Sequence, residues 1–309
     1  MHKEKVLIIK PGYSETLDGE ISMITSLGDV IRSTALLRLY ENAHVTWLVD
    51  ETAFPLLKGN PFIHRILSYN LTSILQLQSE RFDTVINLEK VPGLCAFSDS
   101  INAWRRYGFR FDPENGVALA YDSSQHVLAI CMDPEYKKAA KKYWVENLFE
   151  MVGAKWKGEG YVLGYKPKSD VIYDIGFNYD VGKKWPNKAW PMEYWKELER
   201  LIGKKYTISW QQGLKDTEEY FEWINSCNVF VTNDSLGLHI ASALNKKIIA
   251  LFGPTLAFEI HLPNGVKLLP EFDYDCIPCL SQRCTQSKLC MDYIKPEKVY
   301  DAIEKIIGG

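Results

Sequence analysis

The sequence lacks the long apolar runs and the strong charge that mark membrane or nucleic-acid proteins. No window of about 18 uninterrupted apolar residues occurs, so no transmembrane helix is predicted. The 36 basic and 39 acidic residues nearly cancel to a formal charge of −3, and this balance creates no global field that favours nucleic acid. We therefore expect no nucleic-acid partner and a small, locally bound ligand.

Two common nucleotide-binding motifs and a signal peptide are also missing. No G-x-G-x-x-G follows a strand-like segment, because Gly158-Glu159-Gly160 lies in a linker with the wrong continuation, and no P-loop is present. A dehydrogenase is therefore disfavoured. The apolar run Val6–Ile9 near the start is too short for a signal sequence and has no cleavage pattern. We expect a cytoplasmic protein that could also lie at the inner face of the cytoplasmic membrane.

Seven cysteines are present, and four of them form the pattern C-x2-C-x4-C-x5-C near the C-terminus, at Cys276, Cys279, Cys284 and Cys290. Four soft ligands at this density can make a tetrahedral Zn²⁺ or iron site that pins an irregular loop. Free thiols and disulfides are the alternatives. We predict a structural metal site here, with no part in catalysis.

Strand-like and helical stretches alternate along the chain, which indicates an α/β fold. The predicted strands are Val6–Ile9, Val45–Val49, Thr84–Leu88, Val171–Phe177, Tyr206–Trp210, Val229–Val231 and Ile248–Leu251. The predicted helices are Asp29–Tyr40, Thr52–Leu57, Leu71–Ser79, Tyr136–Val152, Met192–Ile202, Thr217–Ser226 and Pro296–Ile307. A stretch dense in glycine and lysine, Gly153–Ser169, separates two halves. We predict two Rossmann-like lobes, 1–165 and 166–309, with parallel sheets facing a central cleft.

The most informative segment is Thr232–Ala241, followed by a strand that ends in Gly253-Pro254-Thr255. An apolar strand runs into a polar turn with the carboxylate of Asp234, and a helix starts at once. The free N–H groups and the positive dipole end of a helix form an anion site, for which a diphosphate is a natural ligand. The alternative is that Asp234 only caps its helix.

Two further segments carry candidate site residues. The first begins the first predicted helix, and the second follows the first predicted strand of the second lobe. Asp29, in Ser26–Thr34, could accept a proton as a general base, or it could only stabilise the helix dipole. Basic side chains of Gly182–Pro191 could neutralise a departing diphosphate. The alternative for this loop is solvated lysines with its two tryptophans in the core.

Together these segments resemble glycosyltransferase family 9, the ADP-heptose:lipopolysaccharide heptosyltransferases. The matching residues are Ser26-Leu27-Gly28-Asp29, Lys188-Ala189-Trp190-Pro191 with Glu193, Asn233 through His239, and Leu251 through Thr255. The resemblance implies a GT-B fold and an inverting transfer, without a catalytic cofactor, from an ADP-linked sugar such as ADP-heptose. The acceptor would be a lipopolysaccharide core or a related glycan or lipid-linked molecule.

The resemblance also implies residue roles. Asp29 would be the base, Lys188 would contact the donor phosphates, and Asp234 with the backbone of Ser235, Leu236, Gly237 and Leu238 would hold ribose and diphosphate. His239 and Thr255 are further donor-side candidates, and Ser26, Gly28 and Arg32 are acceptor-side candidates. Residues 1–165 would bind the acceptor and 166–309 the nucleotide sugar.

Three segments depart from the family or lie outside its motifs. Pro11–Ser22 is an insert with three carboxylates that could shape acceptor choice or be an ordinary surface loop. Ser209–Gly213 offers a glutamine pair to a base or ribose. The lysine-rich Lys137–Trp144 could make a peripheral contact with an anionic membrane, or it could be a solvated helix face.

Two other functions fit the same scaffold. A nucleotide-sugar epimerase would use acidic residues without any acceptor. A non-catalytic nucleotide-sugar-binding protein would bind the donor regardless of Asp29. The order of the motifs argues against the epimerase.

Overall fold

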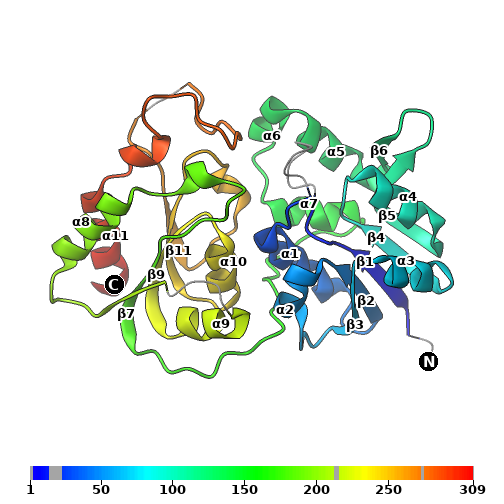
Figure 1. The fold of residues 1–309 in the computed structure, drawn as a ribbon, viewed down its shortest axis with the longest axis horizontal. Helices are drawn as coiled ribbons and strands as arrows, with labels where there is room; N and C mark the ends of the chain where they lie inside the picture. Colours follow the sequence, from blue (N-terminus) through cyan, green and yellow to red (C-terminus); the bar gives the residue numbers. More distant parts are fainter. Residues whose placement is uncertain (1–2, 14–22, 212–215, 273–274, 309) are drawn as a thin grey trace. The chain divides into compact units, whose positions relative to one another are not determined.

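The computed structural model describes residues 3–13, 23–211, 216–272 and 275–308. The chain divides into two units, Met1–Tyr165 and Lys166–Gly309 (Figure 1). Each unit is a sheet of mainly parallel strands with helices on both faces, which is the arrangement that alternating strands and helices produce.

The sheet of the first unit has the strand order β3-β2-β1-β4-β5-β6. Its strands are β1 Lys5–Ile9, β2 His44–Val49, β3 Ile63–Ser68, β4 Arg81–Asn87, β5 Asn102–Asp112 and β6 Val117–Ala120. All pair in parallel except β6, which is antiparallel to β5. The predictions for β1, β2 and β4 are confirmed. Sequence inspection missed β3 and β5 because charged residues such as Arg65 and Arg105 interrupt their apolar patterns.

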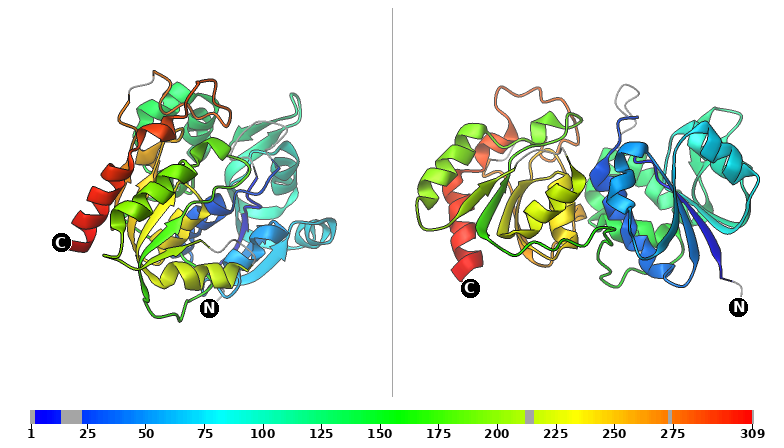
Figure 2. Two further views of the ribbon diagram at one scale, coloured as in Figure 1. Left: turned by 60° about the vertical axis from the view of Figure 1, so that its left-hand side comes forward. Right: turned by 60° about the horizontal axis from the view of Figure 1, so that its bottom comes forward.

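Helices cover both faces of this sheet (Figure 2). They are α1 Leu27–Ser33, α2 Phe54–Leu57, α3 Leu71–Gln78, α4 Pro92–Ser100, α5 Gln125–Met132, α6 Pro134–Ala140 and α7 Trp144–Met151, with 3-10 turns at Thr34–Leu39, Glu51–Ala53 and Asp122–Ser124. The prediction of one helix over Tyr136–Val152 is wrong. Lys141 adopts a left-handed backbone with φ 47°, which ends α6, and Tyr143 is the N-cap of α7.

The sheet of the second unit is entirely parallel, in the order β11-β10-β9-β7-β8. Its strands are β7 Tyr173–Asn178, β8 Ile208–Trp210, β9 Cys227–Asn233, β10 Lys247–Leu251 and β11 Gly265–Leu268. The strand order reverses between β7 and β9. At such a switch point the loops leave toward opposite faces, which opens a ligand-binding crevice at the carboxyl ends of the strands.

Four helices cover the second sheet: α8 Met192–Ile202, α9 Thr217–Asn225, α10 Leu236–Ala243 and α11 Pro296–Gly308, with 3-10 turns at Pro186–Lys188, Ala257–Glu259 and Cys290–Tyr293. In Figure 1, α8 and α11 lie together on one face. Their apolar stripes bury Trp195 and Ile303 against strand residues such as Phe177. Burying side chains of this size contributes roughly 1.5–3 kcal/mol each. The apolar faces of α8 and α11 therefore hold in place the second sheet, whose carboxyl edge carries the candidate site.

The segment that connects the two units is held by the first unit at one end and by the second unit at the other. Gly164 passes so close to the end of α2 that an added Cβ would lie 2.1 Å from the Lys58 carbonyl oxygen. In the second unit, the Glu222 carboxylate accepts hydrogen bonds from the backbone N–H groups of Lys168 and Ser169. Most of the predicted linker Gly153–Ser169 is therefore tied to one unit or the other.

None of the helices in the described part of the chain combines the length and the apolar character that spanning a bilayer requires.

Candidate functional site

Asp29, the predicted base, lies in a buried charge cluster at the carboxyl edge of the first sheet. Lys10 directly follows β1, and Glu89 follows β4, its neighbour at the point where the strand order reverses. The Lys10 ammonium lies 2.5 Å from one Asp29 oxygen and 3.2 Å from Glu89. Arg32, one turn along α1, lies 2.7 Å from the other Asp29 oxygen. The cluster holds two acids and two cations.

Burial and pairing act in opposite directions on these groups. Burial alone would raise the pKa of Asp29, but Lys10 and Arg32 outweigh it and hold that pKa well below its usual range. Burial alone would lower the pKa of Lys10, and its two carboxylate neighbours raise that pKa instead. Asp29 is therefore ionised, as a base must be. Each of its two carboxylate oxygens is already paired with a cationic side chain.

The start of α1 is held by backbone geometry. Ser26 is the N-cap residue, its side chain makes no capping bond, and its N–H donates to the Gly12 carbonyl at 2.7 Å. Gly12 has φ 103°, and a Cβ there would lie 2.9 Å from side-chain carbons of Thr25 and Val30. Ser26 and Gly28 are half-buried beside Asp29. Arg32 also stacks over Trp144 of α7, 5.6 Å from the ring centroid.

Lys188, Asp234 and Thr255 meet at the carboxyl edge of the second sheet. Lys188 ends a 3-10 turn after β7, Asp234 follows β9, and Thr255 follows β10. The Lys188 ammonium lies 2.9 Å from an Asp234 oxygen, and the Thr255 hydroxyl donates to the same oxygen at 2.7 Å. Three residues that the sequence places far apart thus share one buried cluster.

Asp234 does not cap α10, which disfavours the capping interpretation. Ser235 occupies the N-cap position, and its side chain makes no capping bond, so the first N–H groups of α10 are not covered by that hydroxyl. Burial alone would raise the pKa of Asp234, but Lys188 and then His239 outweigh it and lower the pKa to about 2. Leu236 is half-buried, and Gly237, Leu238 and His239 are buried in the following turns.

Two buried asparagines position this cluster, and sequence inspection assigned neither a role. Asn178, the last residue of β7, donates to Thr232 at 2.7 Å and to the Ser235 hydroxyl at 2.9 Å. Asn233 accepts from the Trp190 N–H and donates to the Tyr179 carbonyl, so it ties the Lys188 loop to β9. The signal available in the sequence is a polar residue at the end of an apolar parallel strand, which also marks Lys10 and Glu89.

The structure does not support the predicted metal site at Cys276, Cys279, Cys284 and Cys290. All four are free thiols, and the described residues contain no group of three or more His, Cys, Asp or Glu side chains that could hold a metal ion. Burial, with Cys279 and Cys284 nearby, raises the pKa of Cys290 to about 11.

Hydrogen bonds to the neighbouring loops hold this cysteine segment. Leu280 donates to the Pro254 carbonyl at 2.8 Å, and Asn187 donates to the Ser281 carbonyl at 2.7 Å. The segment therefore packs on the two loops that carry Thr255 and Lys188.

The other predicted segments are only partly described. Residues 14–22 of the insert and Gln212 and Gly213 lie outside the described residues. Gln211 accepts a hydrogen bond from the Asp180 N–H at 3.1 Å. In the lysine-rich segment, Lys138 pairs with Glu135 and Lys142 with Glu150.

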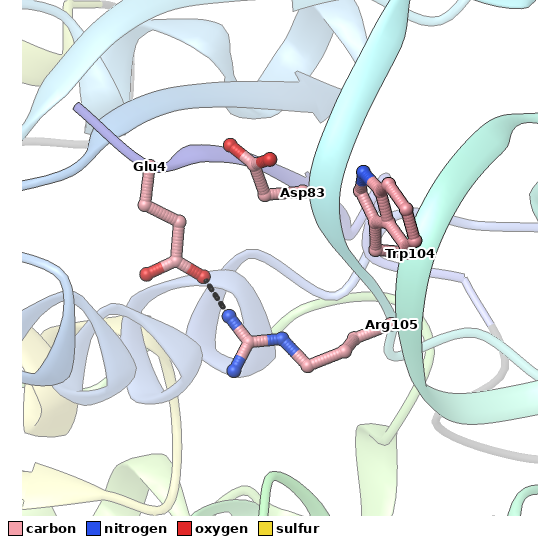
Figure 3. A pocket seen from close by; sticks show the side chains of 4 residues that line it. All are labelled: Glu4, Asp83, Trp104 and Arg105. Carbon is pink, nitrogen blue, oxygen red and sulfur yellow. Dashed lines mark hydrogen bonds and ion pairs between the residues drawn. The ribbon is translucent and has the colours of Figure 1, made fainter. Parts of the chain in front are cut away.

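A pocket of about 380 Å³ lies near the amino ends of the strands of the first sheet (Figure 3). Glu4, Asp83, Trp104 and Arg105 line it, and Arg105 donates to Glu4 at 2.7 Å. This edge is opposite to the one that carries Asp29, so the pocket is not part of the candidate site.

Comparisons with known proteins agree with the motifs. The family model "Glycosyltransferase family 9 (heptosyltransferase)" matches residues 213–289. A lipooligosaccharide heptosyltransferase 2 of Campylobacter jejuni is 39% identical over 83 residues, which are 26% of this chain and 26% of that protein. A lipopolysaccharide heptosyltransferase 1 of Campylobacter coli is 20% identical across 93% of this chain and 98% of its own length. The structure of E. coli ADP-heptose LPS heptosyltransferase II has a TM-score of 0.67 at 17% identity, covering 98% of both chains.

The two Rossmann-like units and this structural likeness define a protein with the GT-B fold, as the sequence predicts. The chain spans about a quarter of the Campylobacter jejuni relative in this local match. The stretch that the family model matches contains Asp234 and Thr255. Together with the similarity to heptosyltransferases over most of its length, this match makes the chain similar to the proteins of glycosyltransferase family 9.

Proposed function

We propose that this chain is an inverting glycosyltransferase that moves a heptose from ADP-heptose to a lipopolysaccharide core or a related glycan. The observation that carries the proposal is the Lys188–Asp234–Thr255 cluster beside the N-terminus of α10. Departure of a nucleoside diphosphate builds negative charge on its oxygens. A lysine and a helix N-terminus stabilise that charge without a divalent ion.

The second unit, residues 166–309, is proposed to bind the nucleotide sugar. Lys188 would exchange Asp234 for the diphosphate, and the first backbone N–H groups of α10 would donate to phosphate oxygens. The freed Asp234 carboxylate would accept from ribose hydroxyls, with Thr255 holding its orientation. The proximity of buried His239 to Asp234 supports a place for His239 on the donor side.

The first unit, residues 1–165, is proposed to bind the acceptor. Asp29 would take the proton from the attacking acceptor hydroxyl as its oxygen bonds to the anomeric carbon. The bond between that carbon and the diphosphate oxygen breaks on the opposite side, so the configuration inverts. Ser26, Gly28 and Arg32 surround Asp29 and would orient the acceptor.

The test is a panel of nucleotide sugars and nucleoside diphosphates in a thermal shift assay, followed by transfer assays with glycan acceptors. A bound ligand raises the melting temperature by mass action. We expect ADP and ADP-heptose to give the largest shifts, and transfer to require an acceptor. Isomerised sugar without an acceptor would indicate an epimerase. Donor binding without turnover on any acceptor would indicate a binding protein.

A peripheral membrane contact through Lys137–Trp144 is a separate proposal. Lys137 stacks over Trp144, and exposed Met132 and Tyr136 lie just before it in the chain. Sedimentation with vesicles that contain anionic lipid tests the contact. Binding by the wild type that is lost in Lys137→Glu would support it. No binding above that to neutral vesicles would reject it.

A further inference from the structure

The proposed mechanism leaves one fully buried acid in the first unit without a role. Glu89 has no exposed surface. Its Oε1 atom accepts from the Gly12 N–H at 2.7 Å and the Tyr13 N–H at 3.0 Å, and lies 3.2 Å from the Lys10 ammonium. A buried carboxylate is costly unless such partners satisfy it.

Glu89 connects to Asp29 through Lys10. The Lys10 ammonium contacts both carboxylates, and Arg32 contacts Asp29. Among the described residues, the charged groups that contact Asp29 are Lys10, which follows β1, and Arg32 of α1. Glu89, which follows β4, contacts Lys10. Tyr13 lies beyond them and donates to Asp50 at 2.5 Å. The two cations and two carboxylates named here, all among the described residues, sum to zero charge.

Proton uptake by Asp29 changes this balance. When the acceptor O–H bond breaks and the proton moves to Asp29, the cluster passes from neutral to a charge of +1. Without the carboxylate of Glu89, the same step would pass from +1 to +2. The second change costs more in a buried environment, because like charges repel strongly where water is excluded.

We propose, on the basis of the proposed function, that Glu89 is a positioning residue that holds Lys10 against Asp29 and offsets one of the two cations that the base faces. Its charge makes Asp29 a stronger base. The backbone of Glu89 is itself fixed, because its N–H donates to Asn87 at 3.1 Å and Asn87 donates to the Phe109 carbonyl at 2.8 Å.

The variant Glu89→Gln tests the charge of Glu89 separately from its hydrogen bonds. The glutamine carbonyl can still accept from Gly12 and Tyr13, so only the charge is lost. We expect kcat to fall about ten- to a hundredfold, since general base catalysis is worth ~10²–10⁴. The donor KM should stay unchanged, and the solvent deuterium isotope effect on kcat should increase because proton transfer becomes harder. Glu80→Gln, which removes the acid paired with Arg65 at 2.7 Å, is the matched control and should keep kcat.

A second variant guards against a simple folding defect. Lys10→Met combined with Glu89→Gln removes one charge of each sign and restores neutrality. We expect it to transfer faster than Glu89→Gln alone. Wild-type kcat in Glu89→Gln, or a double variant no faster than the single one, would overturn the role of Glu89. Failure of the wild type to transfer from any nucleotide sugar would instead overturn the proposed function, and this role with it.

Discussion

The Lys188 ammonium lies 2.9 Å from the Asp234 carboxylate, and the two side chains are only 10% and 11% exposed. Each therefore neutralises the other before any ligand arrives. A diphosphate would have to displace Asp234 from Lys188, so binding would exchange one ion pair for another. Lys188 would then keep an anionic partner throughout, and hydroxyl groups would satisfy the displaced Asp234 carboxylate.

Replacing Asp234 should weaken donor binding. Asp234→Ala removes the proposed ribose acceptor and leaves Lys188 without its partner. We expect a ten- to hundredfold loss of affinity for ADP, since hydrogen bonds to charged groups contribute about 1.5–3 kcal/mol. Isothermal titration with ADP measures it. Unchanged affinity would remove Asp234 from the donor site.

Replacing Asp29 should affect the chemistry and not donor binding. Asp29→Asn keeps the shape of the side chain but loses the base, so transfer should fall about 10²–10⁴-fold. The thermal shift given by ADP should stay at its wild-type size. A variant that transfers at the wild-type rate would contradict the assignment of Asp29 as the base.

Asp234 should make the stability of the protein depend on pH in the acid range. Its pKa is about 2 in the folded protein and 3.8 ordinarily, so folding favours the ionised form. The stabilisation is present above pH 3.8 and is lost as the pH falls through 2. The full loss is about 2 kcal/mol. Urea unfolding at several pH values checks this, and the loss should be smaller in Asp234→Asn.

Gly237→Ala should destabilise the second unit. A Cβ at Gly237 would lie 2.4 Å from the Tyr220 hydroxyl and 2.5 Å from the Asn178 amide nitrogen. These two side chains are held together, because the Tyr220 hydroxyl donates to the Asn178 side-chain oxygen at 2.7 Å. We expect a loss of about 1–3 kcal/mol, typical of overpacking. Gly182→Ala is the control, because no atom lies within 4 Å of its added Cβ. Equal melting temperatures for both variants would show that Asn178 and Tyr220 can yield.

Chelation should leave the protein folded. Hydrogen bonds from Leu280 and Asn187 hold the cysteine segment, and no metal group occurs among the described residues. We therefore expect the same melting temperature with and without EDTA, measured by calorimetry. A large drop would restore the metal site that the cysteine spacing predicts.

Local signals in the sequence were sufficient for several elements. The helix Met192–Ile202 was predicted with its observed bounds, because Pro191 and Gly203 flank a clear apolar stripe. The helix over Tyr136–Val152 was wrong because lysines and alanines favour helix at every position. Helix propensity gives no sign of the left-handed turn at Lys141 that divides the segment.

The candidate site shows the same limit. Asp29, Lys188 and Asp234 belong to the family motifs and could be predicted as site residues. The contact between Lys10 and Glu89 could not be predicted. Their contact depends on β1 pairing with β4, which are separated by about seventy residues of chain. The pairing of Thr255 with Asp234 likewise follows from two adjacent strand ends.

Gly164 packs closely against Lys58, and the Lys168 N–H donates to Glu222. Only three residues of the chain lie between Gly164 and Lys168: Tyr165, Lys166 and Pro167. The proline ring fixes one of the backbone angles in this stretch. Substitutions in this tripeptide would therefore change the stiffness of the connection between the units and leave the residues of both charge clusters in place.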